Sequence, residues 1–269
     1  MKHLHLRLVF CILVLCYASS CAKKLPSRQA VIYPNYHKKE LGASAKDLLS
    51  NDRFTSLTVE IQYMPGFRPQ PETLDTLHSF LTSHLKKSDG IKIVISELKN
   101  VKKKMLTKDE VVAIEDAARS LLPADKNLTL YMLFTDGSHP DKNILGMAYR
   151  NTSTVIFGKS VAKHSGNNKL LTKSELETSV VFHEIGHLLG LGNPQAAALN
   201  SKSATSRNGH CDNKSCLMYW ATETRNPTVI SRRGKIPQFG RECLETIEGM
   251  RGRRDLEYPD EPTSFISGF

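Results

Sequence analysis

The segment from Thr172 to Gly192 constrains the fold of this 269-residue chain more than any other segment. Thr172 and Glu175 are spaced as in a capping box, which satisfies backbone N–H groups at a helix N-terminus. A run of mostly apolar residues follows, interrupted by the sequence HEIGH, and Gly190 and Gly192 are typical helix stops. A helix is therefore predicted over 172–192, with histidines and a glutamate near its end.

Upstream, strand and helix patterns alternate. Strands are predicted where β-branched and apolar residues alternate or run together: over 54–64, 90–98 and 127–137, with a fourth strand or a hairpin over 147–160. Helices are predicted over 71–87 and, from a second capping box, over 106–122. The chain after the motif is irregular except for a short amphipathic helix over 241–250. This order predicts an α/β fold with a twisted mixed sheet of four to five strands.

His183, Glu184 and His187 form the pattern HExxH on the predicted helix. Histidines four residues apart project from one helix face, where both imidazoles can hold one zinc ion at about 2.0–2.1 Å. Glu184 points roughly 100° around the helix, where its carboxylate can reach a water bound to that ion and act as general base. Zinc lowers the pKa of such a water towards about 7. The pattern therefore predicts hydrolysis of a peptide carbonyl, with Glu184 returning the proton to the leaving amine.

The third metal ligand is not where the pattern leads one to look for it. Through Gly190 the sequence resembles the metzincin peptidases, whose pattern HExxHxxGxxH ends in a third histidine, but Asn193 occupies that position here. The later segment GHCDNKSCLMYW resembles the stretch that directly follows the glycine in archaemetzincins. This resemblance implies that His210 is the third ligand. It also implies that 193–209 contains a surface insertion whose ends return close together.

The resemblance carries further expectations about fold and activity. It implies an α+β zincin fold, one catalytic zinc ion and endopeptidase activity on peptides or proteins. Met218 would be the Met-turn methionine, an apolar floor beneath the ligands, and Tyr219 a weak candidate for oxyanion support. The sequence MAYRNTSTVIF would provide a sheet edge that aligns an extended substrate by main-chain pairing. A similar arrangement is found in predicted membrane-attached metalloproteases of bacteria.

Three cysteines in the C-terminal part of the sequence, Cys211, Cys216 and Cys243, allow two interpretations. Archaemetzincins hold a second zinc ion on four cysteines, and three do not complete such a site, so a second zinc is in doubt. In an oxidising compartment a disulfide between Cys211 and Cys216, or between Cys216 and Cys243, is at least as well supported.

The N-terminus predicts export. Residues 1–20 combine a basic start with a short apolar stretch, as in a secretory signal, and Ala18-Ser-Ser-Cys21 resembles the lipobox of bacterial lipoproteins. We expect Cys21 to be lipidated and to anchor the protein to the membrane at the cell envelope; simple secretion is the alternative. The polar residues 21–50 are predicted to be a tether.

Residues 51–192 are then the zincin N-terminal subdomain, and 193–269 a smaller irregular C-terminal subdomain with the third ligand and the Met-turn. The net charge of +10 is scattered without a basic–aromatic stripe, so no nucleic-acid partner is expected, and we expect a monomer. Other histidines, among them His37 and His78, are expected at the surface. The competing hypothesis is a non-catalytic zinc-binding surface lipoprotein on a metzincin scaffold.

Overall fold

A computed structural model describes residues 29–99, 103–166, 171–192, 205–207, 209–219 and 236–252. All helices and strands named below belong to the compact unit that begins at Val31. The predicted signal segment 1–20, the proposed lipid site Cys21 and Asn193 lie outside the described residues.

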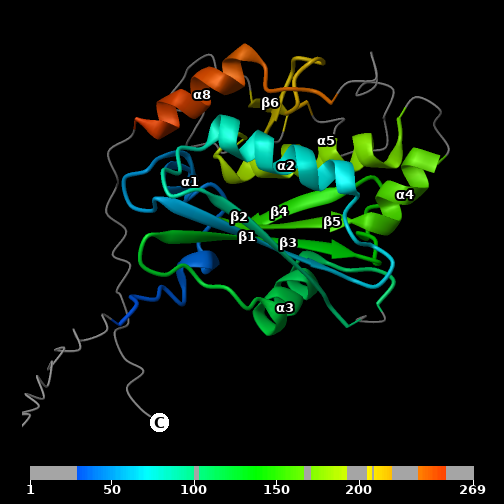
Figure 1. The fold of residues 1–269 in the computed structure, drawn as a ribbon. Helices are drawn as coiled ribbons and strands as arrows, with labels where there is room; N and C mark the ends of the chain where they lie inside the picture. Colours follow the sequence, from blue (N-terminus) through cyan, green and yellow to red (C-terminus); the bar gives the residue numbers. More distant parts are fainter. Residues whose placement is uncertain are drawn as a thin grey trace, which may run out of the picture. The chain divides into compact units, whose positions relative to one another are not determined.

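The described residues form a five-stranded mixed sheet in the order β2-β1-β3-β5-β4, which confirms the predicted fold class (Figure 1). The strands are β1 (Ser56–Tyr63), β2 (Ile91–Glu97), β3 (Asn127–Thr135), β4 (Gly146–Arg150) and β5 (Ser153–Phe157). The pairs β1–β2, β1–β3 and β3–β5 are parallel, whereas β4 runs antiparallel to β5. The segment predicted as a strand or hairpin is thus a hairpin, and its first strand lies at the sheet edge.

Helices cover both faces of the sheet (Figure 1). They are α2 (Pro71–His84), α3 (Lys108–Ala118), α4 (Gly158–Gly166) and α5 (Lys173–Leu188). Helices α2 and α5 pack together on one face and α3 on the other. Both predicted capping boxes form: Thr107 Oγ1 accepts from Glu110 N, and Thr172 Oγ1 accepts from Glu175 N. These boxes start α3 and α5 where the sequence predicts.

Helix α5 is buried on nearly all sides, which explains why its sequence is apolar around most of its circumference. Val180, Val181 and Ile185 are at most 1% exposed and belong to the core that α5 shares with α2 and with the sheet face that these two helices cover. A smaller apolar cluster, which includes Val111 and Tyr149, fills the space between the sheet and α3. The motif helix therefore runs through the main core rather than along the surface.

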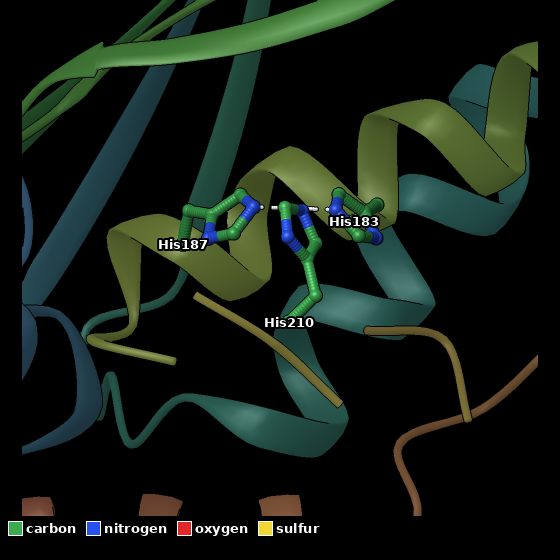
Figure 2. Close-up of side chains that lie close together, drawn as sticks. All are labelled: His183, His187 and His210. Atoms are coloured by element: carbon green, nitrogen blue, oxygen red, sulfur yellow. Dashed lines mark hydrogen bonds between the residues drawn. The ribbon is translucent and has the colours of Figure 1, made fainter. Parts of the chain in front are cut away.

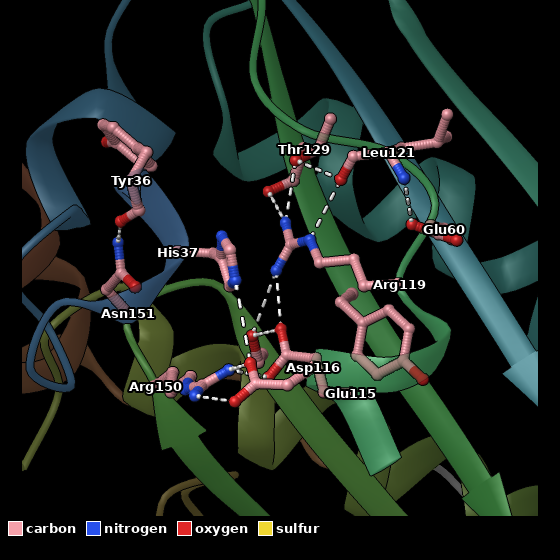
Figure 3. Close-up of polar contacts among 12 residues, drawn as sticks. Tyr36, His37, Glu60, Glu115, Asp116, Arg119, Leu121, Thr129, Arg150 and Asn151 are labelled. Carbon is pink, nitrogen blue, oxygen red and sulfur yellow. Dashed lines mark hydrogen bonds and ion pairs between the residues drawn. The ribbon is translucent and has the colours of Figure 1, made fainter. Parts of the chain in front are cut away.

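A network of buried polar groups joins α3 to the sheet face that it covers (Figure 3). Glu115 is fully buried and accepts from Arg119 Nη1 at 2.7 Å, Arg150 Nη1 at 3.0 Å and Ser153 Oγ at 2.6 Å. His37 lies beside this network and is only 5% exposed, so the prediction that it is a surface residue is wrong. Desolvation by burial lowers the pKa of His37 to about 4.

Within the described part of the predicted tether, residues 31–50 are folded and packed, and that prediction is wrong for these residues. It contains a short 3-10 helix, η1 (Tyr36–Lys38), and α1 (Ala45–Leu49). Tyr36 and Leu49 are at most 2% exposed, and Asn151 Nδ2 donates to Tyr36 O at 2.8 Å. The prediction missed a few apolar side chains of this polar segment that complete the core. It also could not anticipate that side chains from distant parts of the chain hydrogen-bond to the backbone of this segment.

The C-terminal part shares the same core. The described elements are β6 (Thr205–Arg207), β7 (His210–Cys211) and α8 (Arg241–Arg251). Ile247 and Met250 of α8 are buried in the cluster that also holds α5, and α8 packs against α1. Within the described residues, every helix is too short or too polar to cross a bilayer.

Candidate metal centre

Three histidines converge at the C-terminal end of α5 (Figure 2). His183 and His187 project from α5, and His210 reaches them from β7. The ring centroids are 4.9 Å apart for His183 and His187, 5.3 Å for His183 and His210, and 5.2 Å for His187 and His210. One ligand nitrogen of each ring lies within 4.8 Å of the others, as a single shared ion requires.

The hydrogen bonds of the α5 histidines fit a metal ion. His183 Nδ1 donates to Leu217 O at 2.8 Å, and His187 Nδ1 donates to Leu191 O at 3.0 Å. With the protons on Nδ1, both Nε2 atoms carry lone pairs, yet these two nitrogens face each other at 3.2 Å. A cation between them resolves that repulsion, and nitrogens about 2.0–2.1 Å from a tetrahedral zinc stand about 3.3 Å apart. The donor set therefore fits zinc.

His210 reaches the other two histidines because the chain returns to where it left α5. Gly192 and Gly209 have φ values of +85° and +89°, and a Cβ on Gly192 would lie 2.0 Å from Gly209 O. The two backbones touch, which confirms the prediction that the ends of the insertion come together. Most of the insertion itself lies outside the described residues.

Met218 lies directly beneath the motif helix. It is 1% exposed, and a Cβ on Gly186 would lie 2.3 Å from Met218 Sδ, so glycine at this helix position admits the methionine. Cys211 N donates to Met218 O at 2.7 Å, which ties the methionine to the residue after the third histidine. Tyr219 is half-buried and its N–H donates to Cys216 O at 3.0 Å; its role in oxyanion support stays a prediction.

The side chain of Glu184 lies between α5, to which it belongs, and the edge strand β4. It is 1% exposed, and its Oε2 accepts from Ala148 N at 2.7 Å. A buried carboxylate one residue after a histidine of this cluster can exchange protons with a water and a leaving amine in a site from which bulk solvent is largely excluded.

The three cysteines form a second cluster of candidate metal-binding atoms. Their sulfur atoms lie within 4.8 Å of one another, and all three are buried free thiols, so neither predicted disulfide is present. Cys216 Sγ is 3.5 Å from Cys243 Sγ, well beyond the roughly 2.05 Å of a disulfide. Hydrogen bonds from the Cys211 and Cys243 thiols, and from Gly240 N and Met218 N, lower the pKa of Cys216 to about 3. The cluster offers three of the four ligands typical of structural zinc.

Several groups that hold the site in place are backbone atoms that sequence patterns do not reveal. The carbonyls of Leu191 and Leu217 orient the two α5 histidines, and the amide of Ala148 contacts the glutamate. Any residue type offers these groups, so composition and spacing give no signal for them.

Solved structures similar to this chain were found by comparison of folds, whereas comparison of sequences found none. No known protein family matches the sequence, and no curated protein is detectably similar. The crystal structure of archaemetzincin from Methanopyrus kandleri is 17% identical, covers 74% of this chain and 97% of its own, and gives a TM-score of 0.49. Metalloproteinase-II from Bacteroides fragilis is 14% identical, covers 76% of this chain and 57% of its own, with a TM-score of 0.39. These likenesses concern the arrangement of the chain, whereas the chemistry rests on the residues of this site.

Proposed function

We propose that this chain is a zinc-dependent metalloendopeptidase that hydrolyses peptide bonds with Glu184 as general base. The observation that carries the proposal is the convergence of three imidazoles from two distant segments onto one point, beside a buried carboxylate. His183, His187 and His210 would hold one catalytic zinc ion. A purely structural zinc site has no use for a carboxylate in this position, so its presence supports catalysis.

The residues divide the work of hydrolysis. A bound zinc ion would polarise the scissile carbonyl and acidify the attacking water. Glu184 accepts the proton of that water on a carboxylate oxygen and delivers it to the leaving amine. The outer edge of β4 aligns an extended peptide by main-chain pairing, because an edge strand presents backbone groups along the side that has no neighbouring strand.

Metal stoichiometry tests the ligand assignment. The purified chain should contain one tightly bound zinc ion, measured by inductively coupled plasma mass spectrometry after dialysis. His210→Ala should lose that ion, whereas His78→Ala, an exposed histidine of α2, and Asn193→Ala should retain it. Zinc loss on Asn193→Ala with retention on His210→Ala would overturn the assignment. A second equivalent that disappears in Cys243→Ser would place another ion on the cysteine cluster.

Cleavage of a peptide library tests the catalytic step. Glu184→Gln preserves the volume of the side chain and removes the base, so this variant should retain zinc and lose cleavage. If the zinc-loaded wild type cleaves nothing in a broad library, the non-catalytic zinc-binding lipoprotein is the better description and the peptidase proposal fails.

For location we propose a lipoprotein of the bacterial cell envelope, supported by the signal-like residues 1–20 and by the resemblance of Ala18-Ser-Ser-Cys21 to a lipobox. Membrane fractionation of the full-length chain expressed in a bacterium tests it. The wild type should sediment with membranes, and Cys21→Ser should shift the protein to the soluble fraction or leave it unprocessed. Wild type that is released as soluble protein would favour simple secretion.

A further inference from the structure

The amide of Ala148 lies on the outer side of the sheet edge. Phe157 N donates to Leu145 O, so these two residues form a hydrogen-bonded pair of the antiparallel β4–β5 ladder. Such pairs alternate along an antiparallel ladder, so the amides of Gly146 and Ala148 point away from β5. An outward amide on an edge strand ordinarily faces solvent or a docking peptide. Here the Ala148 amide donates to Glu184 Oε2 at 2.7 Å.

Glycine at 146 makes this contact sterically feasible. A Cβ on Gly146 would lie 2.7 Å from Glu184 Oε1, 3.0 Å from Glu184 Cγ and 2.6 Å from Val180 Cγ1. Real Cβ atoms do not approach heavy atoms this closely, so any side chain at 146 would push the glutamate away. Helix α5 therefore approaches β4 at Gly146, and two residues later the Ala148 amide donates to the carboxylate.

Further along β4, contacts with α3 fix the strand. The register of β4 on β5 shifts between Ala148 and Arg150, and this bulge turns the Arg150 side chain towards α3 (Figure 3). Arg150 Nη1 donates to Glu115 Oε2 at 3.0 Å and to Asp116 Oδ1 at 2.6 Å. The edge strand is therefore anchored two residues from the amide that contacts Glu184, which limits its freedom to move away from α5.

We propose that Gly146 and the Ala148 amide are positioning elements for the general base: the amide holds one carboxylate oxygen, and the glycine leaves the space in which the carboxylate sits. This inference rests on the proposed peptidase function for its kinetic consequence. Its structural part does not, because the hydrogen bond can be measured in protein without metal or substrate. A base held in one orientation reacts faster because less rotational freedom is lost on reaching the transition state.

Amide hydrogen exchange, read by NMR on the metal-free chain, tests the hydrogen bond directly. The Ala148 amide should be protected in the wild type and in Glu184→Gln, whose side-chain carbonyl can still accept. Glu184→Ala should speed its exchange at least tenfold. The Gly137 amide, which donates to Thr135 Oγ1 at 3.0 Å away from Glu184, is the internal reference and should change little. Unchanged exchange at Ala148, or an equal acceleration at both amides, would overturn the proposal.

Kinetics of Gly146→Ala test the consequence for catalysis. A displacement of the base by about 1 Å predicts a fall in kcat on the order of 100-fold, with KM and bound zinc unchanged. Gly137→Ala is the matched control, since its Cβ would lie 2.8 Å from Leu106 Cδ1, a comparable crowding away from the site. It should leave kcat unaltered. A wild-type kcat in Gly146→Ala would refute the positioning role, whereas a wild type without cleavage would refute the peptidase proposal and leave the exchange result standing.

Discussion

The buried carboxylate of Glu115 should contribute far more to the free energy of unfolding than the exposed carboxylate of Asp116, although both bind Arg150. Glu115 is fully buried, whereas the Asp116 side chain is 42% exposed. Glu115 also binds Arg119, whose side chain is 2% exposed and is therefore as desolvated as its partner. The two substitutions Glu115→Gln and Asp116→Asn remove the same charge with little change in volume, so burial is the variable that differs between them.

The magnitudes follow from what each substitution leaves behind. Glu115→Gln leaves the Arg119 guanidinium buried without a counter-charge, although it still donates to Thr129 Oγ1 at 2.7 Å and Leu121 O at 3.0 Å. Removing one partner of a buried ion pair costs about 3–5 kcal/mol. Asp116→Asn weakens an exposed pair, for which about 0–1 kcal/mol is typical. Because domains of this kind are stable by only about 5–15 kcal/mol, the first substitution should remove a large share of the total.

Urea denaturation followed by far-ultraviolet circular dichroism measures both effects. The midpoint should fall strongly for Glu115→Gln and barely for Asp116→Asn, with the slope against urea unchanged in both. The reasoning is refuted if Glu115→Gln costs less than about 1 kcal/mol, or if the two variants lose equal stability. Either result would mean that the network is solvated to a degree that its burial does not indicate.

Further predictions concern pH, the glycine contact and the Met-turn. The pKa of His37 is about 4 in the folded protein and near 6.5 in the unfolded chain, so the unfolded chain binds more protons between these pH values. The free energy of unfolding should therefore fall as the pH drops from 6.5 to 4. Urea titration at several pH values measures this fall, which should be smaller in His37→Phe. Gly192→Ala should lower zinc affinity, measured by chelator competition, because its Cβ would meet Gly209 O at 2.0 Å; an unaltered affinity would contradict the role of this contact. Gly186→Ala should cost about 1–3 kcal/mol by overpacking against Met218, and Gly186→Ala combined with Met218→Ala should recover part of that loss in thermal unfolding, a result that additive losses would rule out.

Local patterns were sufficient for most of the regular structure. The capping residues Thr107 and Thr172 start their helices as predicted, and the apolar alternation places the strands within a few residues of their observed ends. These signals are local because a cap or a strand face depends on residues a few positions apart. The predicted helix over 106–122 ends earlier, at Ala118, because the distant Glu60 carboxylate accepts from Ser120 N and Leu121 N and draws the chain out of the helix.

What the sequence by itself determined is the pair of histidines with its glutamate, since four residues of helix fix their relative directions. Only the tertiary structure brings His210 to the other two histidines, because its position depends on the backbones of Gly192 and Gly209 meeting far from each other in the sequence. It also decided that 31–50 is packed and that the cysteines are free thiols held in one cluster. The physical reason is the same in each case. The contacts join backbone groups or side chains that are far apart in the chain, and such contacts produce no periodic pattern in the sequence.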